Sequence, residues 1–96
     1  MFDEGQFLER ARLDHATLEI WIREEWLVPA RSGEAPEYSE IDVARARLIH
    51  DLRGNMGVND EGLSVILHLI DQMHGLRKAL AEALATLHGA ETRKLP

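Results

Sequence analysis

Five histidines give this chain most of its capacity for metal chemistry, because the sequence contains no cysteine. They are His15, His50, His68, His74 and His88. A helical zinc site commonly uses two histidines four positions apart. No pair has that spacing, since even His68 and His74 are separated by six positions and lean toward different faces of a helix. We therefore expect no metal site, and the lack of thiols excludes disulfides and thiol catalysis.

A hydroxyl, an imidazole and a carboxylate also fall within two turns of one predicted helix, at Ser64, His68 and Asp71. A serine nucleophile needs a base in contact with it, a group that orients the base and a site for the oxyanion. One side of an exposed helix offers no pocket for that assembly. The seven glycines are isolated and form no phosphate-binding loop. We predict that the protein is not an enzyme and binds no cofactor.

Acidic residues dominate the charge of the 96-residue chain, with 17 Asp and Glu against 11 Lys and Arg and a net charge of −6. The excess is concentrated in residues 1–30, which carry seven acidic and three basic groups. Nucleic-acid binding takes its sequence-independent affinity from Lys and Arg. Nucleic acid is therefore not the expected partner.

The sequence also lacks the signals that direct a protein to a membrane. Residues 1–10 are acidic and contain no apolar segment of the kind found in a secretory signal. No apolar run approaches the roughly 20 residues that cross a bilayer. We expect a cytoplasmic protein without membrane association.

Helix-capping residues mark the elements that must position these side chains. Each can accept a hydrogen bond from an unpaired N–H in the first turn of a helix. The four capping residues are Asp3, Asp14, Ser39 and Asn59. They predict helices at about residues 4–11, 15–26, 40–53 and 60–88. Residues 30–37 contain Gly33 and Pro36 and predict a loop or a short β-wing, so the fold class is all-α, or mainly helical.

Two of these helices have apolar positions that predict a buried stripe. In the second helix the stripe comprises Leu18, Trp21, Ile22 and Trp26. In the third helix it comprises Ile41, Ala44, Leu48 and Leu52. We expect Trp21 in the core, whereas Trp26 at a helix end could be exposed as a binding anchor.

The last helix has apolar residues spaced alternately by four and three positions, which is the period of a coiled coil. The stripe comprises Leu69, Met73, Leu76, Leu80, Ala83 and Leu87. Near the start of the helix, Leu63, Ile66, Leu67 and Ile70 widen the apolar face. We therefore predict a core domain over residues 1–58 and, over 59–96, a helix that covers the core, forms a homodimer and ends in a frayed tail.

The segment from Thr17 to Arg31 resembles the MerR family of winged helix-turn-helix proteins. The family pattern contains Thr-Leu-Arg, an aromatic residue, Gly-Leu, a spacer, Pro and Arg. Thr17, Leu18, the second aromatic residue and Pro29 fall in register. The resemblance covers roughly residues 4–70 and implies a short wing followed by further helices. The family's DNA-contacting arginine corresponds to Glu19, and its turn glycine to Glu25. A carboxylate at position 19 repels phosphate.

A narrower resemblance, over most of the chain, is to the chaperone modulator CbpM family. Three segments carry it: residues 38–53, 56–63 and 69–77. The resemblance implies a dimeric MerR-like protein that binds the J-domain of a DnaJ-type co-chaperone such as CbpA and inhibits its co-operation with the Hsp70 chaperone DnaK.

A DNA-binding regulator of the MerR or HspR kind is the alternative, because residues 57–62 also resemble the heat-shock repressor HspR. Basic residues could then line a patch beside the wing: Arg12, Arg23, Arg31, Arg45 and Arg47.

Acidic residues are the candidates for contact with a basic helix of a J-domain, because opposite charges steer an encounter and set its register. The candidates in the second helix and its end are Glu19, Glu24, Glu25 and the aromatic Trp26. Those in the last helix are Asp60, Glu61 and Asp71. The closer resemblance to CbpM in the last helix slightly favours the second group.

Overall fold

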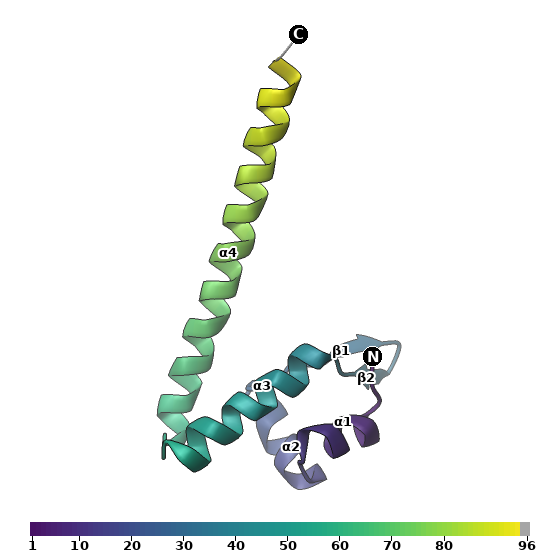
Figure 1. Cartoon of the computed structure of the whole chain (residues 1–96). Coiled ribbons are helices and arrows are strands. Elements are labelled where there is room, and N and C mark those ends of the chain that lie inside the picture. The colour runs from purple at the N-terminus through teal and green to yellow at the C-terminus, as the bar shows by residue number, and fades with distance from the viewer. Residues whose placement is uncertain (95–96) are drawn as a thin grey trace. The chain divides into compact units, whose positions relative to one another are not determined.

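The computed structural model describes residues 1–94, with side chains up to Gly89, as a mainly helical chain with one small hairpin (Figure 1). The elements are α1 (Glu4–Ala11), α2 (His15–Arg23), β1 (Ala30–Ser32), β2 (Ala35–Glu37), α3 (Glu40–His50), the π-helical turn η1 (Asp51–Asn55) and α4 (Asp60–Lys94). They form two compact parts, Met1–Ser64 and Val65–Pro96. The predicted fold class, with its wing and long last helix, is confirmed.

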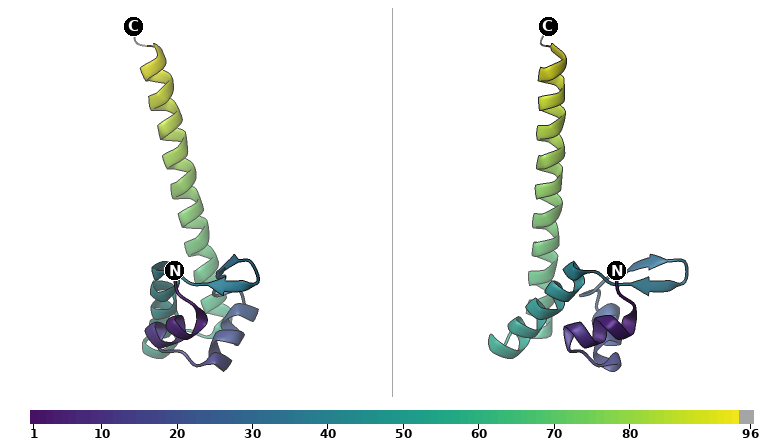
Figure 2. Two further views of the ribbon diagram at one scale, coloured as in Figure 1. Left: turned by 90° about the vertical axis from the view of Figure 1, so that its right-hand side faces the viewer. Right: turned by 45° about the vertical axis from the view of Figure 1, so that its right-hand side comes forward.

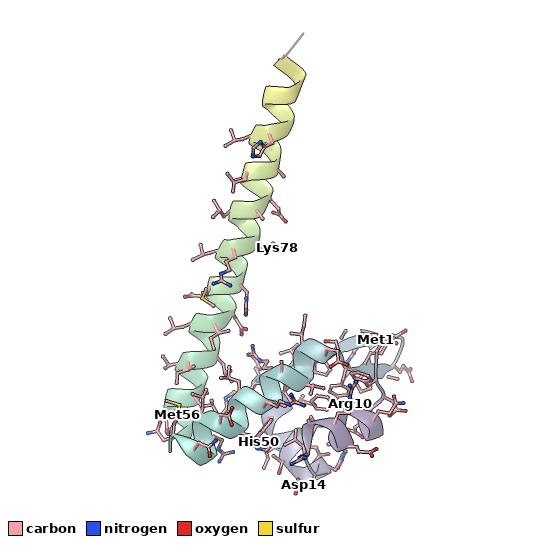
Figure 3. All side chains as sticks on the ribbon, viewed as in Figure 1. Met1, Arg10, Asp14, His50, Met56 and Lys78 are labelled. Atoms are coloured by element: carbon pink, nitrogen blue, oxygen red, sulfur yellow. The ribbon has the colours of Figure 1, made fainter. Side chains whose placement is uncertain are left out.

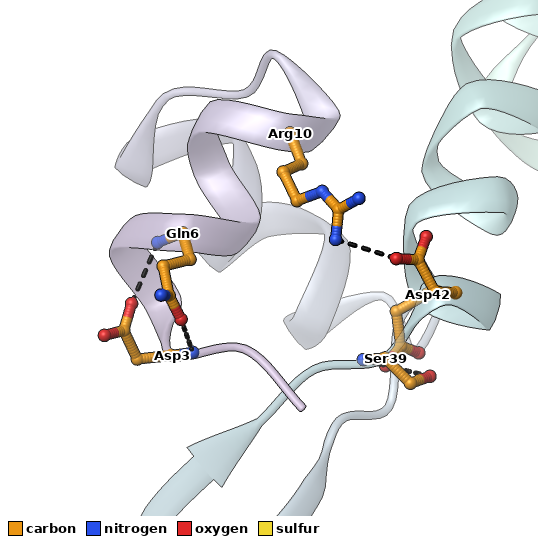
Figure 4. A network of polar contacts seen from close by, with 6 residues as sticks. Asp3, Gln6, Arg10, Ser39 and Asp42 are labelled. Atoms are coloured by element: carbon orange, nitrogen blue, oxygen red, sulfur yellow. Dashed lines mark hydrogen bonds and ion pairs between the residues drawn. The ribbon is translucent and has the colours of Figure 1, made fainter.

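Reciprocal capping bonds begin α1, as the sequence predicts. The Asp3 carboxylate accepts a hydrogen bond from the Gln6 N–H at 2.8 Å, and the Gln6 side chain accepts one from the Asp3 N–H at 3.0 Å (Figure 4). At the start of α3, the Asp42 carboxylate accepts a bond from the Ser39 N–H at 2.9 Å. These bonds satisfy N–H groups that have no partner within the helix.

The ends of the helices differ from the expected boundaries. α2 ends at Arg23 rather than near residue 26, because Glu25 takes a left-handed conformation with φ 62°. α3 ends at His50, and the chain continues as η1. α4 extends to Lys94, beyond the expected end near residue 88 and into the predicted frayed tail, of which residues 95–96 lie outside the described residues. The separate roles assigned to residues 1–58 and 59–96 stay predictions.

The wing is a two-stranded antiparallel hairpin tied to the start of the chain. Ala30 pairs with Glu37 and Ser32 with Ala35, and Gly33 in the turn has φ 68°. Phe2 and Tyr38 exchange two backbone hydrogen bonds of 2.7 and 2.9 Å, so the N-terminus lies beside the hairpin (Figure 2). These bonds fix the base of the wing to α1.

Aromatic residues fill the core of the first part. Phe7 stacks on Tyr38 with ring centroids 4.3 Å apart. The Trp21 and His50 rings meet in an edge-on arrangement with their centroids 5.2 Å apart. The largest fully buried side chains are Trp21, Tyr38, Phe7, Leu18, Leu27, Ile49 and Leu63. The expected burial of Trp21 is thus confirmed.

The prediction of which face of α3 is buried is largely wrong. Ile41 is 78% exposed and Ala44 is also exposed, whereas the buried residues of the helix are Val43, Ala46 and Ile49. Leu48 is half-buried, and only Leu52 is buried as predicted. α3 has apolar residues on both sides, so its pattern alone does not identify the side that packs.

Candidate interaction surface

The exposed face of α2 begins at a well-formed cap. The Asp14 carboxylate accepts a hydrogen bond from the Thr17 N–H at 2.7 Å. Hydrogen bonds from Thr17 favour the charged form and lower the pKa of Asp14. The helix then buries Leu18 and Trp21, while Glu19, Ile20, Ile22 and Arg23 are exposed.

Three exposed carboxylates lie on α2 and in the turn after it: Glu19 on the helix, and Glu24 and Glu25 directly after its end. The His15 imidazole lies 3.0 Å from a Glu19 oxygen and 3.5 Å from a Glu4 oxygen. A protonated His15 would offset part of this charge. α2 and the two residues after it contain three carboxylates and one arginine, Arg23, so this segment is predominantly acidic.

Apolar side chains lie exposed beside these carboxylates. Ile20 is 48% exposed and Ile22 37% exposed, which corrects the prediction that Ile22 belongs to the buried stripe. A groove of about 450 Å³ runs between the end of α2 and the wing. Its apolar walls include Ile22, Val28, Pro29 and Pro36. Glu4, Glu25 and Arg31 also line it, so the groove combines apolar surface with a slight excess of negative charge.

Trp26 belongs to the core and not to this surface. It is 2% exposed, and its indole N–H donates a hydrogen bond to the Ser64 hydroxyl at 2.9 Å. The Arg45 guanidinium donates to the Trp26 carbonyl, and the Arg53 guanidinium lies 5.6 Å from the indole ring centre. The expectation of an exposed Trp26 anchor is therefore wrong, because the side chain is held on several sides.

The acidic candidates in α4 form a less coherent group. Asp60 lies 3.4 Å from the Arg53 guanidinium, which offsets its charge. Glu61 is exposed at the start of the helix, and Asp71, also exposed, belongs to the second compact part. Both acidic groups, the one on α2 and its end and the one on α4, therefore stay candidates for contact with a partner.

The apolar stripe of α4 is exposed in the single chain. The exposed fractions are 56% for Leu69, 42% for Met73, 72% for Leu76, 61% for Leu80 and 60% for Leu87. Leu84, which the sequence analysis did not include, is 47% exposed and widens the stripe. Leu63 and Leu67, nearer the start of the helix, are buried.

The described residues give little support to catalysis at Ser64 or to metal binding. The Ser64 hydroxyl accepts the Trp26 hydrogen bond and so has a structural role. Among the side chains that the structure describes, up to residue 89, no group of three or more His, Asp or Glu is placed to hold a metal ion. No helix within residues 1–94 has both the length and the hydropathy needed to cross a membrane.

Residues 5–70, more than half of the chain, match the family described as MerR HTH family regulatory protein. The chain belongs to this family. No curated protein and no solved structure matches the chain. In this MerR-type winged helix-turn-helix, Glu25 takes the left-handed conformation expected of the turn glycine to which it corresponds. Glu19 lies exposed on α2.

Sequence reasoning identified the carboxylates of α2 but missed the groove beside them. The groove combines the end of α2, the wing and Tyr38, which are joined only in the folded chain. One signal was present in the sequence: α2 carries Ile20 and Ile22 as well as Leu18 and Trp21. A helix cannot bury all four on one stripe.

Proposed function

We propose that this MerR-family protein is a protein-interaction module of the CbpM kind, which binds the J-domain of a DnaJ-type co-chaperone and inhibits its co-operation with Hsp70. One observation carries the proposal. Glu19 on α2, and Glu24 and Glu25 directly after the helix, are all exposed to solvent. Carboxylates there oppose a phosphate backbone and favour a basic protein surface.

The groove beside α2 supplies the apolar contact that such a complex needs. Charge complementarity mainly sets the rate of encounter and the register, whereas affinity comes from a few buried apolar anchors. Ile22, Val28 and Pro29 border the carboxylates in the same compact part. A basic amphipathic helix, which the CbpM resemblance implies for the J-domain, could place its charges against Glu19 and Glu24 and an apolar residue in the groove.

We also propose that the protein acts as a homodimer through the stripe on α4. Leu69, Leu76 and Leu80 are each more than half exposed in one chain. The alternation by four and three positions suits packing against a second copy of the same helix. The α2 surface lies in the other compact part, so each protomer would carry its own J-domain site.

A DNA-binding regulator is the second candidate, favoured by membership of the MerR family. Its proposed basic residues are partly engaged elsewhere. Arg45 donates to the Trp26 carbonyl, and Arg31 donates to the Glu34 carbonyl at 3.1 Å. Arg12, Arg23 and Arg47 stay exposed and could reach phosphates.

Calorimetric titration of a purified J-domain into the full chain tests the proposal. We expect saturable binding that the double variant Glu19→Lys and Glu24→Lys weakens at least about tenfold, with a smaller loss at high salt. The matched control Glu82→Lys alters an exposed acid on α4 and should change the affinity by less than about twofold.

A folded protein that shows no J-domain binding would overturn the proposal. A mobility-shift assay at low salt distinguishes the alternative. Tight, sequence-selective and salt-sensitive binding of a DNA duplex would establish the regulator instead.

A further inference from the structure

Positive charge gathers in one hollow of this acidic chain. The hollow has a volume of about 480 Å³ and lies in the first compact part, among the end of α1, the turn after it and the end of α3. It is lined by Arg10, Ala11, Arg12, Arg47, His50 and Asp51. Figure 3 labels Arg10 and His50 near the crossing of α1 and α3. Three arginines against one aspartate give this hollow the opposite sign to the whole chain, whose net charge is −6.

Some charges of the hollow are already engaged. Arg10 forms a 2.7 Å ion pair with Glu40 (Figure 4) and lies 4.2 Å from the centre of the Phe2 ring. The Asp51 carboxylate accepts a hydrogen bond from the Asn55 side chain at 3.1 Å. Arg10 and Asp51 therefore already have partners within the chain, and we do not expect them to be the main contacts to a ligand.

Arg12 and Arg47 are the available donors. Across the residues that the structure describes, neither guanidinium forms a hydrogen bond or an ion pair, and both residues are exposed. They come from separate elements, the turn after α1 and the last turn of α3, yet line one hollow. The His50 ring adds a further nitrogen and is held by its edge contact with Trp21.

The backbone of Arg12 gives an independent indication. Arg12 caps the end of α1 with φ 56° and ψ 48°, in the left-handed region that favours glycine. An arginine there carries a conformational cost, and such strain often accompanies functional sites. In this conformation Arg12 lines the hollow.

We propose that this hollow binds a single phosphate group, either inorganic phosphate or the terminal phosphate monoester of a small metabolite. Two guanidinium forks that approach from different elements suit a compact oxyanion with several acceptor oxygens. The ring of His50 supplies an additional contact. None of the proposed J-domain-binding carboxylates lines the hollow, so phosphate binding can be tested independently of J-domain binding.

The surrounding charge favours a small anion over a polyanion. Asp14 lies two residues after Arg12 and Glu19 on the following helix, so an extended chain of phosphates at Arg12 would also meet these carboxylates.

Titration of the ¹⁵N-labelled full chain with inorganic phosphate at constant ionic strength tests the site. We expect saturable shifts of amide signals confined to residues 10–12 and 47–51. The variants Arg12→Gly and Arg47→Gln should each weaken binding roughly tenfold, as expected for loss of a charge-assisted hydrogen bond. Arg12→Gly also relieves the left-handed strain, so misfolding would not explain the loss.

Arg23→Gln is the matched control, because Arg23 is exposed on α2 and does not line the hollow. It should leave the affinity for phosphate within about twofold of the wild type. Two outcomes would overturn the proposal: shifts that fail to saturate by about 10 mM phosphate, or shifts that persist in both hollow variants. A short DNA duplex that binds more tightly than phosphate and depends on Arg12 and Arg47 would also overturn it, in favour of a backbone contact.

Discussion

Glu25 holds a backbone conformation that suits a different residue. Its φ of 62° lies in the left-handed region, which costs a side chain with a Cβ about 1–2 kcal/mol. Glycine avoids this cost but loses about 0.5–1 kcal/mol through the freedom of the unfolded chain. We therefore predict that Glu25→Gly raises the free energy of unfolding by up to about 1 kcal/mol, or several degrees in Tm.

Glu24 provides the matched control, because its φ of −76° is an ordinary helical value. Glu24→Gly removes the same charge and gains no relief of strain, so thermal unfolding followed by circular dichroism should show a lower Tm. Equal effects of the two substitutions would indicate that charge, and not backbone conformation, determines the stability of this turn.

Tyr38 buries a hydroxyl that forms no hydrogen bond within the described residues. Such a group carries its full desolvation cost. We predict that Tyr38→Phe leaves stability at neutral pH unchanged or raises it by about 1 kcal/mol, because the stack on Phe7 is kept. Urea unfolding should show the change, and a clear loss of stability would reveal a partner for the hydroxyl.

The same hydroxyl gives stability a dependence on alkaline pH. Burial, helped by the charges of Glu4 and Asp42, raises the pKa of Tyr38 above its usual value near 10. The folded protein therefore holds the proton after the unfolded chain begins to lose it. This contribution is fully present below the unfolded pKa and is lost as the pH rises through the folded pKa. Tyr38→Phe should abolish it.

At the level of the elements, the sequence predicted local features such as helix caps better than it predicted which face of a helix packs against the core. The bonds between Asp3 and Gln6 join residues three apart, so the sequence could identify this cap. The face of α3 could not be read in the same way, because Ile41 and Ile49 are both apolar and only Ile49 is buried. Which side packs depends on neighbours that the pattern does not contain.

This distinction on α3 can be measured. Ile41 is 78% exposed, so Ile41→Gln should change the free energy of unfolding by no more than about 0.5 kcal/mol. Ile49 is fully buried, and Ile49→Ala should cost about 2–5 kcal/mol. Chemical denaturation of both variants gives the comparison. A larger cost at Ile41 would mean that this residue is covered in the protein in solution.

For the whole molecule, the sequence allowed prediction of the charged residues but not of the apolar groove and the basic hollow. The position of Glu19 in α2 could be read directly against the family pattern. The apolar groove joins α2 to the wing, and the basic hollow joins the end of α1 to the end of α3. Both arise from residues brought together only by folding. The hydrogen bond from the Trp26 indole to Ser64 likewise joins residues 38 positions apart in the chain.

The dimer is the prediction that belongs to the whole molecule. Burial of one leucine side chain contributes about 1.5–3 kcal/mol. Loss of Leu76 and Leu80 from both copies would therefore remove at most about 6–12 kcal/mol. A dimer with a Kd near 1 μM has about 8 kcal/mol of binding free energy. We expect Leu76→Glu with Leu80→Glu to give a monomer in analytical ultracentrifugation, where the wild type sediments as a dimer.

Ala81→Glu with Ala85→Glu controls for the added charge. These alanines are exposed on α4 and lie outside the apolar stripe, so the control should sediment as the wild type does. A wild-type protein that is monomeric at about 10 μM would contradict the coiled-coil interpretation. A dimer that survives the two leucine substitutions would contradict it equally, since the contact would then have to lie elsewhere on the chain.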